Sequence, residues 1–289
     1  GNANYYGMMG AFALPFLLGS IWLYLKHQKS WAYLLCGLMV NIHVIYAGFV
    51  FAMFVMDEIL NHDWKRWWEF PVNLLLFGMI ASPVIIWRFQ YGLGDHFVLS
   101  PEILDLVSRG LLHTVFYPLG PFRYAVANFL VGLGTLWGFL LGYRATSRKS
   151  SHKVIRNFCL GLGLLMLIGL LASYLLPSIL LLQFQFLRSG IFLLYFSIFY
   201  LGYFLKEQLS AGSINQTQFI LLAIGLITLG TPLAVIIFWY ILRWMQAINL
   251  KPAYGLSVLI ASQLLLVFYA LHWQLWSPGI HLDGPDSEW

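Results

Sequence analysis

Hydrophobic residues dominate this chain in long runs that short polar joins separate. Because a helix needs about 20 apolar residues to cross the hydrocarbon core of a bilayer, each long run predicts a transmembrane helix. Eight runs qualify, at residues 5–25, 31–56, 70–90, 122–142, 154–176, 189–205, 218–242 and 254–276. The pattern predicts an all-α polytopic membrane helix bundle with about eight transmembrane segments, organised as a single domain over residues 1–289.

The longest interruption runs from Arg88 to Arg123 and contains one predicted interfacial helix. Ser100 suits its N-cap and Pro101 its first turn. At about 3.6 residues per turn, four titratable residues share one edge of this helix: Glu102, Asp105, Arg109 and His113. Such a loop helix suits a membrane protein that performs chemistry at its surface, and equally one that only needs an ordered loop.

Composition also indicates a membrane protein, since only 9% of the 289 residues are charged and 60% are hydrophobic. Soluble domains carry about a quarter charged residues, so lipid must be the main solvent of this chain. The net charge of +5 comes from scattered basic residues, which predict no nucleic-acid binding. Cys36 and Cys159 lie within hydrophobic runs and are interpreted as small core residues, not as a disulfide or a metal pair.

The distribution of Lys and Arg predicts the orientation, because joins rich in these residues face the cytoplasm. The join at residues 144–156 carries five of them, so the central stretch 91–121 is expected on the outer side. Counting back along the segments then puts Lys26 and Lys29 outside, against the rule. Either segment 31–56 is a half-depth hairpin with Asn41 and His43 at a buried turn, or the rule fails at this point.

Small residues and prolines indicate how the helices pack. Gly134, Gly138 and Gly142 recur every four residues and predict a face that another helix approaches closely, within this chain or in a protein partner. Pro83 and Pro232 lie inside predicted segments and are expected to kink them.

Two ionisable residues beside apolar runs are candidates for substrate binding, because lipid offers such groups no partner. His43 is either a donor in a cavity or, as we favour, a buried histidine satisfied by Asn41 or a backbone carbonyl. Arg188 is expected at the outer end of segment 189–205, after a short interfacial helix at 178–187. Its guanidinium suits a phosphate, although an arginine that only reaches lipid headgroups would have the same surroundings in the sequence.

The loop helix offers a second pair of candidates. Arg109 and His113 are four residues apart, so they either hold an anionic headgroup together or form an exposed surface pair. No spaced pair of His or Cys residues predicts a metal site, and no glycine-rich phosphate-binding motif occurs.

Three stretches resemble the transmembrane part of the GT-C-type polytopic glycosyltransferases, which use lipid-phosphate-linked sugars, and of their uncharacterised bacterial relatives. One is LLGSIWLYLKHQKSWAYLLCGLMVNIHVIYAGFVF, with His43 central in its second apolar run. Another is LLLQFQFLRSGIFLLY, similar to an outward short helix that ends in an arginine, here Arg188. The third is SRGLLHTVFYPLGPF, where the residues that match the family's outward loop are Arg109, His113, Tyr117 and Pro118.

The resemblance implies transfer of a sugar from a polyprenyl-phosphate carrier at the outer face of the bacterial inner membrane. The residues that would bind the lipid-linked substrate are Arg109, His113, Arg188 and His43. In such enzymes an Asp or Glu in the first large outward loop acts as the base or binds metal, so a divalent metal is the one cofactor implied. This chain has no starting Met and no such loop before segment 5–25, so it is expected to be the C-terminal part of a longer protein. If the chain is instead complete, the clustered outward carboxylates left to act are Asp95, Glu102 and Asp105, of which Glu102 and Asp105 are the catalytic candidates.

Two other functions stay open at this point. A non-enzymatic membrane subunit or transporter-like protein fits the glycine-spaced helix and the aromatic residues at the ends of the segments. A membrane acyltransferase also uses Arg and His in a bundle of spans.

Overall fold

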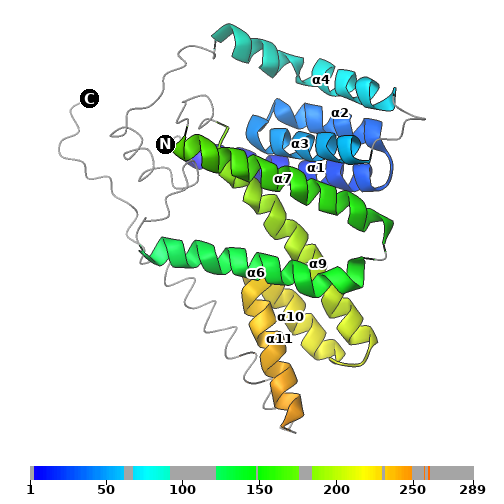
Figure 1. The fold of residues 1–289 in the computed structure, drawn as a ribbon, viewed down its shortest axis with the longest axis vertical. Coiled ribbons are helices and arrows are strands. Elements are labelled where there is room, and N and C mark those ends of the chain that lie inside the picture. Colours follow the sequence, from blue (N-terminus) through cyan, green and yellow to red (C-terminus); the bar gives the residue numbers. More distant parts are fainter. Residues whose placement is uncertain are drawn as a thin grey trace, which may run out of the picture. The chain divides into compact units, whose positions relative to one another are not determined.

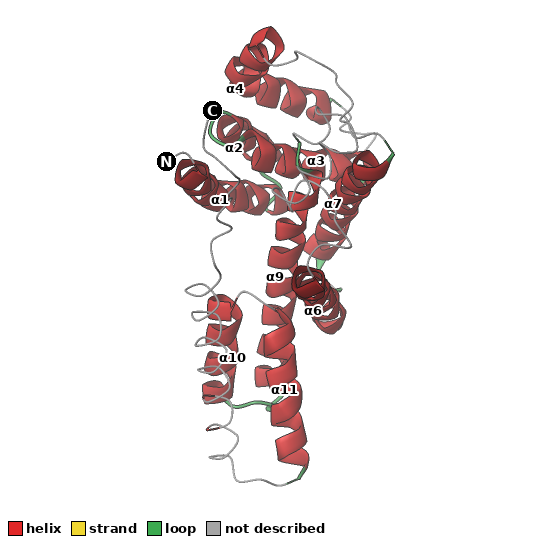
Figure 2. Ribbon diagram, turned by 90° about the vertical axis from the view of Figure 1, so that its left-hand side faces the viewer, coloured by secondary structure: helices red, strands yellow, loops and turns green. Residues whose placement is uncertain are grey.

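The computed structural model describes residues 3–61, 68–91, 122–147, 149–175, 184–229 and 232–248, together with residues 257 and 260. Over these residues the chain forms nine α-helices and one short 3-10 helix, with no strand, which confirms the all-α prediction (Figure 2). Its contacts divide the chain into two compact units. The first comprises Gly1–Val126 and Ser147–Phe196, and the second Ala127–Thr146 and Ser197–Trp289.

The helices follow the hydrophobic runs. The first unit contains α1 (Ala3–Leu25), α2 (Lys29–Val40), α3 (Val44–Leu60), α4 (Glu69–Tyr91), α7 (Ser150–Tyr174) and the 3-10 helix η2 (Phe186–Ser189). The second unit contains α10 (Gln216–Leu229) and α11 (Pro232–Ala247). Two helices contribute residues to both units, α6 (Phe122–Thr146) and α9 (Gly190–Ser210).

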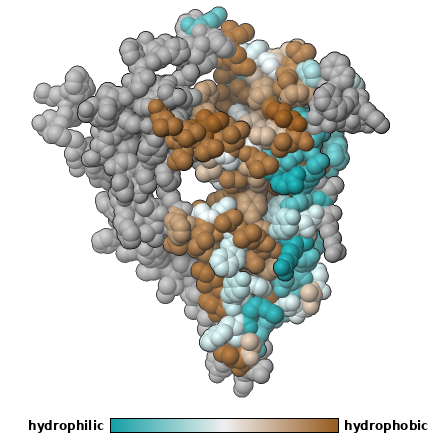
Figure 3. Space-filling model, viewed as in Figure 1, coloured by the Kyte–Doolittle hydropathy of each residue, from teal (hydrophilic) through white to brown (hydrophobic). Residues whose placement is uncertain are grey.

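Three of the described helices are long and apolar enough to cross a membrane, over Glu69–Trp87, Ser151–Leu171 and Gly190–Ser210. They correspond to the predicted segments 70–90, 154–176 and 189–205. The surface of α4 suits lipid, since Leu75, Met79 and Ile86 are exposed on it. Hydrophobic residues also cover much of the described surface in Figure 3. These observations support an integral membrane protein. The predicted segment 254–276 lies outside the described residues apart from Ser257 and Ile260.

The predicted segment 31–56 is not one continuous helix. It is a helical hairpin, because α2 ends at Val40 and α3 begins at Val44 after a turn at Asn41–His43 (Figure 1). The two helices run antiparallel: the Tyr33 and Phe54 rings are 5.3 Å apart, and the Cys36 thiol donates to the Ala47 carbonyl at 3.4 Å. With 12 residues, α2 is about 18 Å long, whereas the hydrocarbon core is about 30 Å thick.

The chain enters this hairpin through a helix cap at the end of α1. His27 adopts a left-handed backbone conformation, with φ of 62°. Its N–H donates to the Tyr24 carbonyl, and the Gln28 N–H donates to the Leu23 carbonyl. This is the bonding pattern of a Schellman motif, and it reverses the chain between α1 and α2. The open end of the hairpin therefore lies beside the end of α1.

Aromatic side chains form the core of the first unit. The Tyr24 ring stacks on Phe54 at 4.4 Å and meets the edge of Phe158 at 5.4 Å, which joins α1, α3 and α7. All three side chains are buried, and α2 packs against both α1 and α4. Gly37 makes the second of these contacts possible, since a Cβ there would lie 2.9 Å from the Phe77 carbonyl oxygen.

The predicted segment 218–242 is also broken into two helices. Pro232 does not kink one long helix, as predicted, but is the first residue of α11, where its fixed φ and missing N–H are well tolerated. The Gln246 amide at the end of α11 donates to the Ser213 carbonyl, just before α10 begins. The two helices therefore form a second antiparallel hairpin, and they lie side by side in Figure 2.

The glycine face of α6 packs against helices of its own chain. A Cβ on Gly134 would lie 2.6 Å from Leu233 Cβ in α11, and one on Gly138 or Gly142 would collide with Ser197 or Tyr200 in α9. Because α6 and α9 lie so close together here, the Ser197 hydroxyl donates to the Thr135 carbonyl at 2.8 Å. The predicted close helix packing is thus present within the second unit, while a separate protein partner at these glycines stays a prediction.

Candidate functional site

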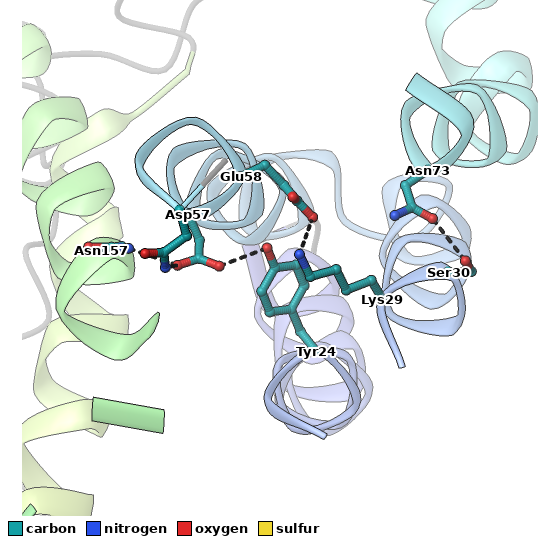
Figure 4. A network of polar contacts seen from close by, with 8 residues as sticks. Tyr24, Lys29, Ser30, Asp57, Glu58, Asn73 and Asn157 are labelled. Atoms are coloured by element: carbon teal, nitrogen blue, oxygen red, sulfur yellow. Dashed lines mark hydrogen bonds and ion pairs between the residues drawn. The ribbon is translucent and has the colours of Figure 1, made fainter. Parts of the chain in front are cut away.

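Polar side chains gather at both ends of the α2–α3 hairpin, and the two groups differ in character. The first group lies at the open end, where Lys29, Asp57 and Glu58 lie close together (Figure 4). Asp57, on α3, is only 2% exposed, although an isolated carboxylate is costly to bury. Its carboxylate accepts from the Tyr24 hydroxyl at 3.0 Å, the Asn157 amide at 2.8 Å and the Asn61 amide. Three donors from α1, α7 and the end of α3 therefore satisfy this side chain.

Glu58 and Lys29 form an ion pair beside Asp57. The Lys29 Nζ lies 2.9 Å from Glu58 Oε1 and 5.4 Å from the centre of the Tyr24 ring. The Ser30 hydroxyl then donates to Asn73 Oδ1 at 2.9 Å, which joins the start of α2 to α4 (Figure 4). Because the carboxylates are paired or hydrogen-bonded, we assign this charged end, formed by Lys29, Asp57, Glu58 and Asn157, to fixing the hairpin between its neighbours.

The hydrogen bonds of the charged end also show where Lys26, Lys153 and Arg156 lie in the first unit. Asn157 lies two turns into α7, so the start of α7 lies beside the open end of the hairpin. Lys26, Lys153 and Arg156 are exposed there. Lys26 and Lys29 thus lie at the same end of the unit as the basic start of α7, as the half-depth hairpin alternative requires.

The second polar group lies at the turn of the hairpin. His43 is the N-cap of α3, and its Nδ1 accepts from the Tyr46 N–H at 3.3 Å. A neutral imidazole that accepts at Nδ1 carries its hydrogen on Nε2, so Nε2 is a donor. The ring stacks on Tyr46 at 4.3 Å, and the Asn41 amide donates to the Ile80 carbonyl in α4. One imidazole nitrogen of His43 is therefore satisfied by backbone at the start of α3.

Arg188 lies on the segment that leads into α9. It belongs to η2, which ends at Ser189, directly before Gly190 begins α9. The first turns of α3 and α9 are in contact, since the Tyr46 and Phe192 rings are 6.1 Å apart. Two helix N-termini, each carrying partial positive charge, thus meet beside a guanidinium. This arrangement favours an anion.

Two polar atoms next to Arg188 have no hydrogen-bond partner although they are buried. One is Oγ of Ser189, whose side chain is fully buried at 0% exposure, and the other is Oε1 of Gln185. Gln185 also has a left-handed backbone, with φ of 49°, which is strained for a residue other than glycine. We call His43, Gln185, Arg188 and Ser189 the turn-end site. Buried oxygens without a hydrogen-bond partner also occur at the charged end, on Glu58 and Asn61, but Lys29 balances the carboxylate there. The turn-end site is therefore the better candidate for binding an anionic ligand.

The structure describes two of the four predicted substrate-binding residues, His43 and Arg188, which lie just before helices whose first turns are in contact. The other two, Arg109 and His113, lie outside the described residues, as do the catalytic candidates Glu102 and Asp105. Within the described ranges, no three His, Cys, Asp or Glu side chains are grouped so that they could hold a metal.

Sequence reasoning missed the buried carboxylates Asp57 and Glu58. They follow the predicted end of segment 31–56 directly, whereas α3 continues to Leu60 and buries both. Two adjacent carboxylates that extend an apolar run in helical register were the available signal. Comparison of the chain with protein-family models, curated proteins and solved structures finds no match.

Proposed function

We propose that this chain is a membrane-embedded glycosyltransferase of the GT-C type, or the membrane half of one. In this proposal it binds a polyprenyl-phosphate-linked sugar at the outer face of the membrane. The observation that carries the proposal is the contact between the first turns of α3 and α9, since His43 caps α3 and Arg188 lies just before α9. A planar guanidinium, an imidazole N–H and two helix N-termini all favour the oxygens of a phosphate. Arg109 and His113 are proposed to contact the same phosphate from the loop at 91–121.

The distribution of basic residues supports the outer location. In our proposal six segments span the membrane, and the α2–α3 and α10–α11 hairpins enter it only part of the way from the cytoplasmic side. Twelve of the sixteen Lys and Arg residues then lie inside, and only Arg88, Arg109, Arg123 and Arg188 lie outside. This agrees with the positive-inside rule at every join, including Lys26 and Lys29. The bacterial inner membrane is the proposed location, with Glu102 and Asp105 as the proposed acid–base groups.

Binding of a lipid-linked phosphate tests this proposal. The purified chain in phosphatidylcholine nanodiscs is titrated with a polyprenyl-phosphate hexose, and bound lipid is measured by native mass spectrometry. We expect Arg188→Ala to weaken binding at least tenfold, because a hydrogen bond to a charged group contributes about 1.5–3 kcal/mol. Arg243→Ala removes the same charge from an exposed position on α11 and is the matched control. Equal binding by both variants and the unaltered chain would remove the proposal's support.

A transporter-like function is the second candidate, and the interrupted segments favour it. A span, a hairpin and a span follow one another in residues 3–91, as α1, α2–α3 and α4. The same order is expected in residues 190–276, as α9, α10–α11 and the predicted span 254–276. Interrupted hydrophobic segments at corresponding positions of two halves are typical of transporters. Uptake of radiolabelled phosphate into proteoliposomes that Arg188→Ala abolishes and Arg243→Ala leaves unchanged would favour this function. Equal uptake by protein-free vesicles would reject it.

A further inference from the structure

The groups of the turn-end site differ in the hydrogen-bonding partner that they require. Arg188 and His43 Nε2 can only donate to a ligand, so they suit anionic oxygen. Gln185 Oε1 is the exception, because it is a buried acceptor without a partner. An acceptor gains nothing from an anionic oxygen and needs a group that carries a hydrogen. The site is therefore suited to more than a bare phosphate.

The backbone fixes Gln185 relative to Arg188. The Arg188 N–H donates to the Gln185 carbonyl at 2.8 Å, which closes a 3-10 type turn. Gln185 and Arg188 thus lie one turn apart in the same short segment, with the buried Oε1 of Gln185 on the residue whose carbonyl closes the turn. Gln185 itself has a left-handed φ of 49°, so the chain changes direction just before η2.

Ser189 adds a group that can act in either direction. Its hydroxyl is fully buried and unpartnered, and a hydroxyl both donates and accepts. Ser189 follows Arg188 directly, as the last residue of η2 before α9 begins at Gly190. A ligand that presents an anionic oxygen and a hydroxyl side by side would use every one of these groups.

We propose that the turn-end site recognises a phosphate ester that carries a hydroxyl next to the phosphate, with Gln185 accepting from that hydroxyl. This inference rests on the proposed phosphate binding at Arg188 and names the substrate class of that site. The same chemistry occurs in a sugar linked to a polyprenyl phosphate and in the glycerol headgroup of phosphatidylglycerol. The bare phosphates that lack it are polyprenyl phosphate and phosphatidic acid.

The experiment compares these lipids pairwise on the full chain in phosphatidylcholine nanodiscs, with bound lipid measured by native mass spectrometry. The unaltered chain should bind the hydroxyl-bearing member of one pair about fivefold more tightly than the bare phosphate, as expected for one buried hydrogen bond. Gln185→Leu should remove this preference and leave binding of the bare phosphate unchanged. Arg188→Ala should instead weaken both members of the pair by the same factor.

The outcomes separate this inference from the proposed function. A preference within the polyprenyl pair supports both, whereas a preference within the glycerol pair alone supports hydroxyl recognition but contradicts the sugar carrier. Equal binding of both members of each pair by the unaltered chain, or a preference that survives Gln185→Leu, overturns the inference and leaves phosphate binding intact. If no phosphate lipid binds, both the inference and the proposed function are wrong. Affinity for the bare phosphate reports whether Gln185→Leu has folded, and Gln185→Asn, which keeps a shorter amide, should retain part of the preference.

Discussion

Replacing Asp57 with alanine should destabilise the first unit, because the Asp57 carboxylate connects three helices. Its carboxylate accepts from Tyr24 on α1 and Asn157 on α7, and both of these donors are buried. Each donor that is left unpartnered costs about 1–3 kcal/mol, so together they cost roughly 2–6 kcal/mol. The third donor, Asn61, is partly exposed and can turn to water.

The removal of the carboxylate itself makes the expected destabilisation by Asp57→Ala smaller. The substitution also removes a buried carboxylate, whose desolvation is itself costly, and the Lys29–Glu58 pair stays balanced without it. We therefore expect a net loss of about 2–3 kcal/mol in the free energy of unfolding. At roughly 2–4 °C per kcal/mol, the melting temperature should fall by about 5–10 °C.

The assay is thermal unfolding of the purified protein in detergent, followed by tryptophan fluorescence. Asn61→Ala is the control, and it should cost less than about 1 kcal/mol because Asn61 is only partly buried and ends α3. The double exchange D57N/N157D moves the carboxylate to α7 while Tyr24 keeps an acceptor, so it should recover most of the loss. The reasoning is refuted if Asp57→Ala melts at the temperature of the unaltered protein, or if Asn61→Ala is equally damaging.

Two further predictions concern packing and charge. Gly134→Ala should destabilise the second unit by about 1–3 kcal/mol, because its Cβ would lie 2.6 Å from Leu233 Cβ, whereas Gly132→Ala meets nothing within 4 Å and should be neutral or slightly stabilising. Thermal unfolding of both variants checks this, and equal effects would contradict the packing of α6. Lys29→Met should lower the free energy of unfolding by about 1–3 kcal/mol, because it leaves the Glu58 carboxylate unpaired. This loss is smaller than that for a fully buried pair, because Lys29 is 30% exposed. Adding Glu58→Gln should recover most of this loss in the same assay, and no recovery would mean that the ion pair is not the cause.

The hydrophobic runs predicted the described helices well, because composition alone shows which stretches can lie in lipid. The two hairpins were harder, since a buried turn does not interrupt apolar sequence strongly. Asn41 and His43 were visible in the first, and the conflict over Lys26 and Lys29 indicated that segment 31–56 needed another reading. In the second, the sequence around Pro232 fits a kink and a helix start equally well, and the structure has Pro232 at the start of α11.

The sites could be predicted only as single residues. His43 and Arg188 stand out because each is ionisable among apolar neighbours, but nothing in the sequence shows that they lie close together. Their proximity depends on the contact between the first turns of α3 and α9, which is a property of tertiary packing. The roles of Gln185 and Ser189 depend on an unpaired oxygen and a left-handed backbone, neither of which sequence reports.

The α2–α3 hairpin is the feature on which the proposed topology depends most, because it puts Lys26 and Lys29 at the same end of the first unit as the start of α7. Labelling of single cysteines with a membrane-impermeant maleimide tests it directly, after Cys36 and Cys159 are replaced. Lys153→Cys and Leu175→Cys, both at exposed positions towards opposite ends of α7, mark the two faces of the membrane. We predict that Lys26→Cys and Leu60→Cys are both labelled from the same face as Lys153→Cys. Labelling of Lys26→Cys and Leu60→Cys from opposite faces would show that segment 31–56 crosses the membrane and would contradict the account.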